Sequence, residues 1–207
     1  MQTVEGFVNR FKVDVRVKSE VTGINPKEKQ VTITNLLTGE SYTETYDKLV
    51  ISTGAEPIKP PLPGMDNKRI FSLRNVPDTD AIKSYLDEIK PKSAVVIGGG
   101  FIGLEMVENL HEAGLKVSVV EKSDQVMAPL DFAMAAMVHR QLKQKRISLY
   151  LGEGVTGFES QDEGVKVLLE KNGSLNADMV ILSIGVRSEI RLAREAGLEV
   201  GSLGGIK

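Results

Sequence analysis

Three glycines restrict this chain more than any other feature of its sequence. They are Gly98, Gly100 and Gly103, they follow the apolar run 94–97, and they match the pattern G-x-G-x-x-G. The first permits a tight turn from strand to helix, the second lets backbone approach a phosphate without an intervening Cβ, and the third lets the helix pack closely on the strand. A helix that starts here offers free N–H groups and the positive end of its dipole to an anion. The spacing therefore predicts a dinucleotide-binding turn.

The residues after the glycines supply the context that this short motif needs. Gly114 stands where a glycine commonly ends a helix, residues 116–120 read as a second strand, and Glu121 closes that strand. A carboxylate at this distance past the glycines meets the ribose diol of an adenosine. The stretch before Gly114 has a helical stripe of apolar residues, namely Ile102, Met106, Val107, Leu110 and Ala113. Strand, glycine turn, helix, strand and acid in this order predict a Rossmann-like unit.

The pattern around this unit predicts an α/β domain with an antiparallel β insert. Asp78 is expected to cap a helix that ends near Ile89, and Asp131 a helix whose inner face is Met134, Met137, Val138 and Leu142. Strands are expected at 70–73, at 147–151 and, fully buried, at 178–185. The insert consists of three alternating segments with a hairpin signal at Asn172-Gly173, and these segments are 155–159, 165–169 and 174–177.

The chain before this domain predicts a short helix, hairpins and one apolar strand. The helix is expected within 1–11, without a capping residue, and it precedes a half-buried strand at 13–17. Hairpin strands are expected at 20–24, 30–36 and 41–46, and an apolar strand at 47–54. Segment 56–64 holds four of the eight prolines and predicts a stiff crossing between domains. Because 46–54 resembles 177–185, we expect two similar nucleotide-binding units, of which only the second is complete.

Composition and charge limit the possible partners. The chain has 207 residues, no cysteine and a formal net charge of −2, so it gives no electrostatic case for nucleic acid and permits neither disulfides nor thiolate metal sites. No apolar run is long enough to span a membrane, and no signal peptide is visible. We expect a cytoplasmic protein. The two histidines, His111 and His139, lack the spacing of a metal site or a catalytic triad and are expected at the surface.

Four stretches together resemble the interior of an FAD-dependent enzyme of the pyridine nucleotide-disulfide oxidoreductase family. They are Tyr46–Pro57, Val96–Leu110, Gln125–Asp131 and Ile184–Arg187. The resemblance runs nearly from end to end, and the middle two stretches point to the coenzyme A-disulfide reductase and NADH oxidase branch. The chain is therefore identified as an internal fragment of such an enzyme.

The resemblance implies a division of the chain. Residues 1–57 would be the end of a first FAD-domain segment, 58–69 a linker, 70–187 the whole NAD(P)-binding domain, and 188–207 the start of a second FAD-domain segment. Three features that the family places elsewhere do not occur in this chain: the first FAD glycine motif, the redox-active cysteine and a Gly-Asp motif facing the flavin. We therefore expect no catalytic residue here and no turnover by this polypeptide alone. Arg187-Ser188 also departs from the family's usual Arg-Pro.

The expected cofactor-binding residues centre on the glycine turn. The resemblance places Gly98, Gly99, Gly100, Phe101, Ile102 and Gly103 at the nucleotide. It also implies that Phe101 lies over the nicotinamide pocket, although packing at the helix start would explain an aromatic residue equally well. Glu105 matches a carboxylate near the nicotinamide, but an acid in the first helical turn is favourable in any case.

Four further expectations lie outside the turn. Glu121 favours NAD by accepting from the ribose diol and repelling a 2′-phosphate, the alternative being a solvated acid at a strand end. The positive charge of its neighbour Lys122 could allow NADP to bind as well. Gly185 resembles a glycine near the nicotinamide or simply ends a strand. Thr53 and Gly54 resemble a turn that contacts FAD in the complete enzyme.

The function expected from the resemblance is delivery of hydride from NAD(P)H to FAD, for reduction of a small disulfide or of oxygen or peroxide. The full-length enzyme is expected to be a homodimer through a domain outside this chain, with neither nucleic acid nor membrane as partner. A non-catalytic NAD-sensing module is the alternative, although it would not need the FAD-like segment 49–57. A short-chain dehydrogenase would need a Tyr-x-x-x-Lys pair, which none of the four tyrosines provides.

Overall fold

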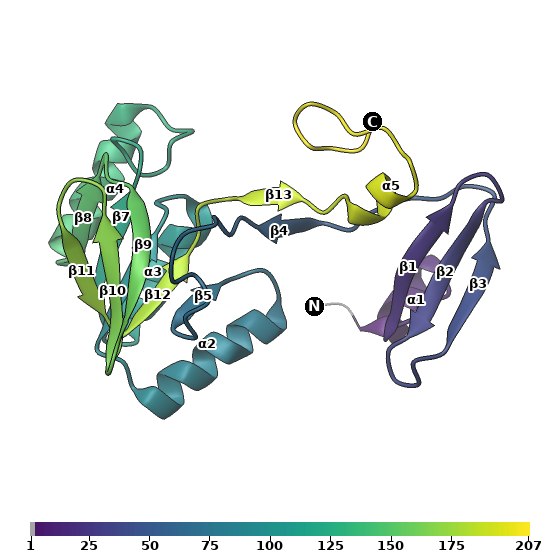
Figure 1. Cartoon of the computed structure of the whole chain (residues 1–207), viewed down its shortest axis with the longest axis horizontal. Coiled ribbons are helices and arrows are strands. Elements are labelled where there is room, and N and C mark those ends of the chain that lie inside the picture. The colour runs from purple at the N-terminus through teal and green to yellow at the C-terminus, as the bar shows by residue number, and fades with distance from the viewer. Residues whose placement is uncertain (1–2) are drawn as a thin grey trace. The chain divides into compact units, whose positions relative to one another are not determined.

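The computed structural model describes residues 3–207, and these form two compact units (Figure 1). The larger unit comprises Ala55–Arg187, and the smaller combines Met1–Gly54 with Ser188–Lys207. Each unit has its own sheets and helices.

A five-stranded parallel sheet forms the centre of the larger unit. The strand order is β5-β12-β6-β7-β8, and every neighbouring pair is parallel. The strands are β5 (Ile70–Ser72), β6 (Ser93–Ile97), β7 (Lys116–Glu121), β8 (Ser148–Leu151) and β12 (Met179–Leu182). Three helices connect them, namely α2 (Val76–Ile89), α3 (Phe101–Glu112) and α4 (Phe132–Gln144). The predicted α/β fold is confirmed, and each of these strands was expected.

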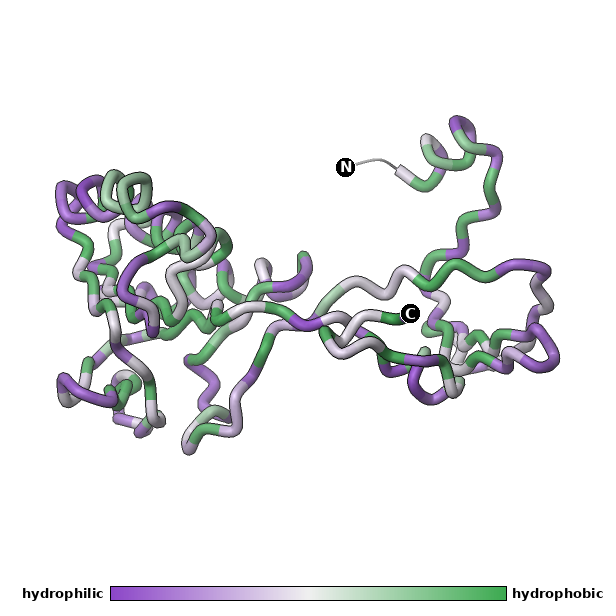
Figure 2. The backbone as a smooth tube through the Cα atoms, turned by 90° about the horizontal axis from the view of Figure 1, so that it is seen from above, coloured by the Kyte–Doolittle hydropathy of each residue, from purple (hydrophilic) through white to green (hydrophobic). Residues whose placement is uncertain are grey.

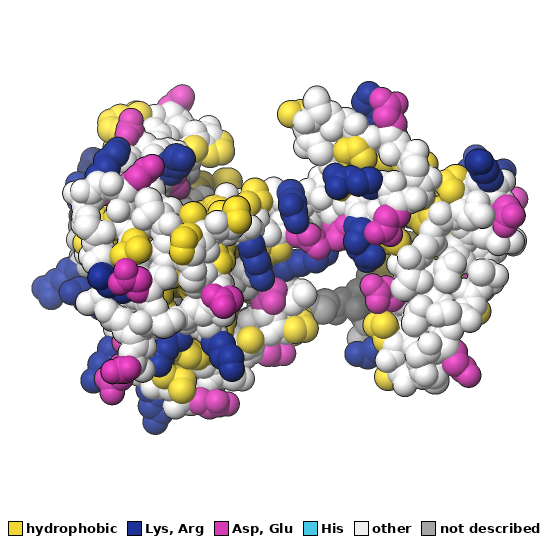
Figure 3. Space-filling view, in the orientation of Figure 1, with side chains coloured by type: hydrophobic (Ala, Val, Ile, Leu, Met, Phe, Trp, Pro, Cys, Tyr) yellow, Lys and Arg dark blue, Asp and Glu magenta, His cyan; other side chains and the backbone are white. Residues whose placement is uncertain are grey.

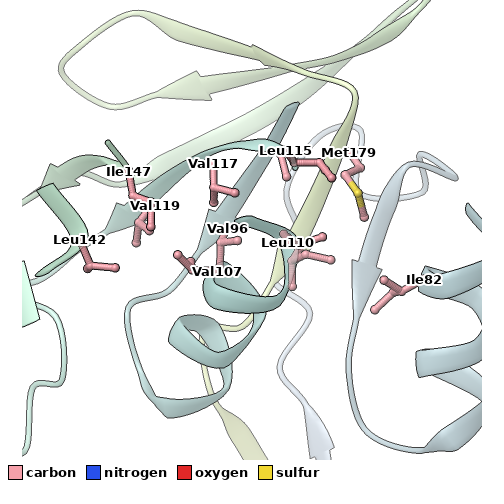
Figure 4. Packing of buried hydrophobic residues seen from close by; sticks show 12 residues of the cluster. Ile82, Val96, Val107, Leu110, Leu115, Val117, Val119, Leu142, Ile147 and Met179 are labelled. Carbon is pink, nitrogen blue, oxygen red and sulfur yellow. The ribbon is translucent and has the colours of Figure 1, made fainter. Parts of the chain in front are cut away.

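The central strands β6, β7 and β12 are mostly apolar because both faces of the sheet are covered. On one face, Val96 and Val119 pack against Val107 of α3 and Leu142 of α4 (Figure 4). On the other face, Val95 packs in a second cluster with residues of the antiparallel sheet. Successive residues of one strand therefore enter different clusters, as the two-residue period of a strand requires.

The second face is covered by the predicted antiparallel insert, which is confirmed. Its order is β11-β10-β9, with β9 (Val155–Gln161), β10 (Gly164–Leu169) and β11 (Ser174–Ala177). Gly173 at the tight turn has φ +74°, a conformation that glycine adopts at no steric cost. Phe158, Val165 and Val167 are buried beneath the parallel sheet.

A short two-stranded ribbon, absent from the expectations, pairs β4 (Ala55–Pro57) with β13 (Val186–Ser188). Three-residue strands with exposed side chains have too little pattern to be recognised. The proline-rich segment that follows β4 lies against the antiparallel insert, where the Phe158 N–H donates to the Pro63 carbonyl at 2.8 Å. Segment 58–69 thus contacts the larger unit instead of crossing free solvent.

The smaller unit contains the predicted hairpins as a three-stranded sheet, β1 (Ser19–Asn25), β2 (Gln30–Asn35) and β3 (Ser41–Thr45). It also contains helices α1 (Val4–Phe11) and α5 (Arg191–Glu195). Hydrophobic and hydrophilic residues alternate around α1 in Figure 2. The expectation of an uncapped start was wrong, because the Thr3 hydroxyl accepts the Gly6 N–H at 3.1 Å. Met1 and Gln2 lie outside the described residues.

Two expected strands of the smaller unit are absent from the described structure. Segments 13–17 and 47–54 have extended or irregular backbone without ladder pairing. Val50, expected in an apolar strand, is 87% exposed. A strand needs ladder hydrogen bonds to a neighbouring strand, and neither segment forms them with any described strand.

Two helix details also differ from expectation. The N-cap of α2 is Asn75, and Asp78 is instead the third helical residue, whose carboxylate completes a capping box. In α4 the inner face is Ala135 and Leu142, whereas Met134 and Met137 are 54% and 60% exposed. The apolar residues of α4 permit either the face with the two methionines or the face with Ala135 to lie inward. The small Ala135 lets α4 lie close to the sheet.

Candidate nucleotide-binding site

The glycine turn connects β6 to α3 at the carboxyl end of the parallel sheet. Gly98 has φ +104°, and its N–H donates to the Val120 carbonyl of β7 at 2.8 Å. A Cβ on Gly98 would lie 2.3 Å from the Ser183 carbonyl oxygen, just past the end of β12. Only glycine fits this position, because both the backbone conformation and the space exclude a side chain.

Gly103 lets α3 approach the turn. A Cβ there would lie 2.0 Å from the Gly98 carbonyl oxygen and 2.7 Å from Ser183 Oγ. The same hydroxyl donates to the carbonyls of Ile97 and Gly98, at 3.0 and 3.2 Å. Ser183 therefore ties the end of β12 to the turn, and Gly103 serves close packing.

Gly100 differs from the other two glycines because its surroundings are open. A Cβ on Gly100 would have no described atom within 4 Å apart from its immediate neighbours. Gly100 is the N-cap of α3, and no side chain from the described part of the chain caps this helix. The first N–H groups of α3 therefore lack an intrahelical acceptor and face a place where an anion fits.

Gly99 is held on both sides of its peptide. Its N–H donates to Glu121 Oε2 at 2.7 Å, and its carbonyl accepts the Met127 N–H at 2.8 Å. The Val126 side chain covers its Cα, since Val126 Cγ1 would be 2.7 Å from an added Cβ. The turn is thus fixed by β7, by β12 and by the loop after β7.

Glu121 closes β7 beside this turn. Its second carboxylate oxygen, Oε1, accepts the Ser123 N–H at 2.7 Å. A carboxylate offers about four lone-pair sites, and these two backbone contacts use two of them. Glu121 is therefore oriented by backbone and still able to accept hydrogen bonds from a ligand diol.

A cavity of about 660 Å³ lies beside the turn, within the larger unit. This volume is in the usual range of small-molecule sites. Residues expected at the nucleotide contribute to its wall, namely Gly98, Gly99, Gly100, Phe101, Ile102, Glu121, Lys122 and Gly185. The ends of β6, β7 and β12 form its floor through Ile97, Val120 and Leu182. The site is therefore at the carboxyl edge of a parallel sheet, where ligands of α/β folds commonly bind.

Four expected residues do not line this cavity. Gly103 is buried under the turn, and Glu105 is exposed on the second turn of α3 rather than in the first. Thr53 and Gly54 belong to the smaller unit, where the Thr53 hydroxyl donates to the Glu189 carbonyl at 2.5 Å. Gly54 has φ +75°. The structure provides no flavin contact for these two residues, so that role stays a prediction.

Phe101 is 65% exposed at the start of α3, so the structure does not give it the simple packing role. Gly185 has φ +114°, and its carbonyl accepts the Ile58 N–H at 3.0 Å. Both residues line the cavity, and Gly185 directly precedes β13. An aromatic ring left in solvent at a cavity mouth is available to contact a planar ligand group.

Glu153 also lines the cavity, although no motif or periodicity pointed to it. Its side chain is 1% exposed, and its carboxylate accepts from the Lys171 N–H at 2.9 Å and from the Asn172 side chain. Burial alone would raise the pKa of Glu153, but hydrogen bonds from Lys171, Asn172 and Glu170 outweigh it and lower the pKa below its ordinary value. Glu153 therefore fastens the turn after β8 to the β10–β11 turn.

This network predicts a specific acid sensitivity. Because the pKa of Glu153 is lower in the folded chain, its contribution to stability is complete above the ordinary value of about 4.3 and is lost as the pH falls below it. Urea unfolding at neutral pH and near pH 3.5 should show a smaller acid-induced loss for Glu153→Gln than for the native chain. Glu170→Gln, at an exposed carboxylate of the same cavity, is the matched control and should behave like the native chain. Equal losses for native and Glu153→Gln chains would contradict the assignment.

Charged side chains on the face shown in Figure 3 are mixed in sign, with Lys and Arg beside Asp and Glu. None of the helices in residues 3–207 combines the length and hydrophobicity needed to cross a membrane. No group of three or more acidic or histidine side chains within those residues is arranged to hold a metal ion.

Comparison with known proteins decides the family. The profile of the pyridine nucleotide-disulphide oxidoreductases matches residues 4–207. The chain belongs to this family. The resemblance stated from the four sequence stretches is therefore confirmed, and the matched proteins include NADH oxidases and coenzyme A disulfide reductases.

Three relatives illustrate the match. The structure of reduced Bacillus anthracis CoADR-RHD is 50% identical with a TM-score of 0.92, over 98% of this chain and 36% of that one. The Lactobacillus brevis water-forming NADH oxidase, whose structure contains NADH, is 30% identical with a TM-score of 0.82. The match covers 89% of this chain and 40% of that one. The Staphylococcus haemolyticus coenzyme A disulfide reductase is 30% identical over 99% of this chain and 45% of that protein. The chain thus spans less than half the length of these relatives.

Proposed function

We propose that the larger unit binds a nicotinamide dinucleotide in the cavity beside the glycine turn. The observation that carries this proposal is the open space at Gly100, next to an uncapped helix start and a cavity of about 660 Å³. Anions bind at helix N-termini because the N–H groups and the helix dipole both favour negative charge. A pyrophosphate fits these requirements.

The remaining wall suits the two ends of such a ligand. Glu121 would accept hydrogen bonds from the adenosine ribose diol through its remaining lone pairs. Phe101 and Gly185 would face the nicotinamide end. We favour NAD over NADP, since a 2′-phosphate would meet the carboxylate of Glu121, although the exposed Lys122 lies next to it.

We further propose that the whole protein is an FAD-dependent NAD(P)H oxidoreductase. Support comes from family membership and from relatives named as coenzyme A disulfide reductase and NADH oxidase. The chemistry supplied by bound NAD(P)H is hydride donation, and the acceptor in such a protein would be FAD held largely outside this chain. A small disulfide such as coenzyme A disulfide, or oxygen, would be the final substrate. A cytoplasmic homodimer, formed through a domain outside this chain, completes the proposal.

Exchange of Glu121 for alanine tests the proposed site and its preference for NAD over NADP. Hydrogen bonds to a charged acceptor contribute about 1.5–3 kcal/mol, so Glu121→Ala should weaken NADH binding about 10- to 100-fold. NADPH binding should weaken much less, because the substitution also removes a repulsive charge. Fluorescence titration with both nucleotides measures the two dissociation constants.

Two observations accompany this test. Glu112→Gln, at the exposed far end of α3, is the matched control and should bind both nucleotides like the native chain. Thermal unfolding of Glu121→Ala shows whether the loss of two backbone contacts alters the fold. Absence of saturable NADH binding by the native chain would disprove the proposed site.

A further inference from the structure

His139 has a role that the sequence did not predict. It lies half-buried on α4, and its Nε2 accepts the Val126 N–H at 3.1 Å. Expected at the surface without a partner, it instead bonds the loop that follows β7. Its ring also has an edge contact with Phe132, at 6.4 Å between centroids.

The loop bonded by His139 is the same loop that holds the glycine turn. Val126 is fully buried against Gly99, and the next residue, Met127, donates its N–H to the Gly99 carbonyl at 2.8 Å. Met127 has φ +53°, an uncommon conformation for a residue with a side chain, which needs support from surrounding contacts. The loop also contributes Ala128 and Pro129 to the cavity wall.

Two internal hydrogen bonds close the loop on itself. The Leu130 N–H donates to the Met127 carbonyl at 2.8 Å, and the Gln125 side chain donates to the Leu130 carbonyl at 2.7 Å. A change at the Val126 N–H therefore reaches both the peptide of Gly99 and the wall formed by the loop.

We propose that His139 is a positioning residue for the nucleotide site: its neutral imidazole holds loop 125–130 against Gly99, and protonation of the ring releases that hold. This inference rests on the proposed function, since it concerns the geometry of the same glycine turn. Nε2 can accept a hydrogen bond only while it carries no proton. An acidic medium therefore removes the acceptor, whereas a glutamine side-chain oxygen in its place would keep it.

The charges around the ring favour its neutral form. Burial, and to a smaller degree the positive charge of Lys143 one turn further along α4, lower the pKa of His139 below its ordinary value. The loop packed against the ring carries Asp124 and Asp131, and within residues 3–207 neither shares a hydrogen bond or an ion pair with His139. Because the folded pKa is depressed, the contact is complete above about pH 6.5 and is lost as the pH falls below the folded value.

The experiment is a calorimetric titration of the 207-residue chain with ADP-ribose, near pH 8 and near pH 5.5. ADP-ribose carries the pyrophosphate and the adenosine, and none of its groups titrates in this range. We expect native affinity to be about three- to tenfold weaker at the lower pH, as the loss of one hydrogen bond implies. His139→Gln should bind ADP-ribose at both pH values with the affinity that the native chain has near pH 8. His139→Phe should bind ADP-ribose weakly at both pH values.

The chain offers a matched control, because His111 is its only other histidine. His111→Gln should retain the native pH dependence. Equal affinity of His139→Phe and native chains, or loss of the pH dependence in His111→Gln, would overturn the role of His139. Absence of ADP-ribose binding by the native chain at both pH values would instead overturn the nucleotide site, and this inference with it.

A second measurement does not depend on any variant folding. Coupling between two sites is reciprocal, so a ligand that binds better to the neutral form must also lower the pKa of the ring. NMR titration of the two imidazoles should show that saturating ADP-ribose lowers the pKa of His139 by about 0.5–1 unit, equivalent to the same three- to tenfold ratio. The pKa of His111 should not move. An unchanged His139 pKa in the saturated chain would overturn the inference.

Discussion

Gly100→Val should abolish saturable NADH binding without lowering the stability of the chain. A Cβ at this position meets no described atom, and its φ of −80° is allowed for any L-residue, so the ligand-free fold accommodates a β-carbon here. The isopropyl group would instead occupy the space in front of the first N–H groups of α3, where the pyrophosphate is proposed to bind. Loss of that contact should weaken affinity at least about 100-fold. Calorimetry with NADH measures the affinity, and urea unfolding the stability.

Gly205→Val is a matched control for this substitution. Gly205 also has open space around its Cβ position and no positive φ, and it belongs to the smaller unit and does not line the cavity. The proposed site would be supported if Gly205→Val binds NADH with native affinity. Gly100→Val should at the same time lose its affinity for NADH and keep native stability. Native affinity in Gly100→Val would show that the nucleotide does not approach the turn at this glycine.

The parallel sheet could be predicted because burial on both faces produces uninterrupted apolar strands. Residues 94–97 and 179–182 have this pattern and form β6 and β12. The same pattern at 47–54 was misleading. An apolar run indicates that a segment tends to be buried, but it does not indicate that a neighbouring strand is present to pair with it. The expected inner face of α4 was wrong at Met134 and Met137 for a related reason, whereas Val138 and Leu142 do pack against the core. Its apolar residues allow two stripes, and contact with the sheet selects the one through Ala135 and Leu142.

The site was predictable as far as one local motif and its spacing determine it. The glycine turn and Glu121 lie close along the chain, and their chemistry can be read from residue type. Glu153 and His139 gave no such signal, because each acts through contacts with residues distant in sequence. Glu153 binds a turn 18 residues away, and His139 binds an amide 13 residues before it. A single polar residue has no periodicity, so only the tertiary contact shows its role.

The glycine turn itself predicts the largest effect on stability. Gly103→Ala should lower the free energy of unfolding by about 3 kcal/mol, because the new Cβ would lie 2.0 Å from the Gly98 carbonyl oxygen. The obstacle is backbone, which cannot rotate away as the end of a flexible side chain can. In an unobstructed helix the same substitution would stabilise by about 1 kcal/mol, so the sign of the change distinguishes the two cases.

Gly100→Ala provides the comparison one turn away. Its Cβ position is open, and we expect its free energy of unfolding to stay within about 0.5 kcal/mol of the native value. Urea denaturation of the native chain and both variants measures the difference. A stable Gly103→Ala chain would mean that α3 can withdraw from β6 at little cost. The third glycine would then no longer be explained by close packing, and a direct role at the nucleotide would become the better account.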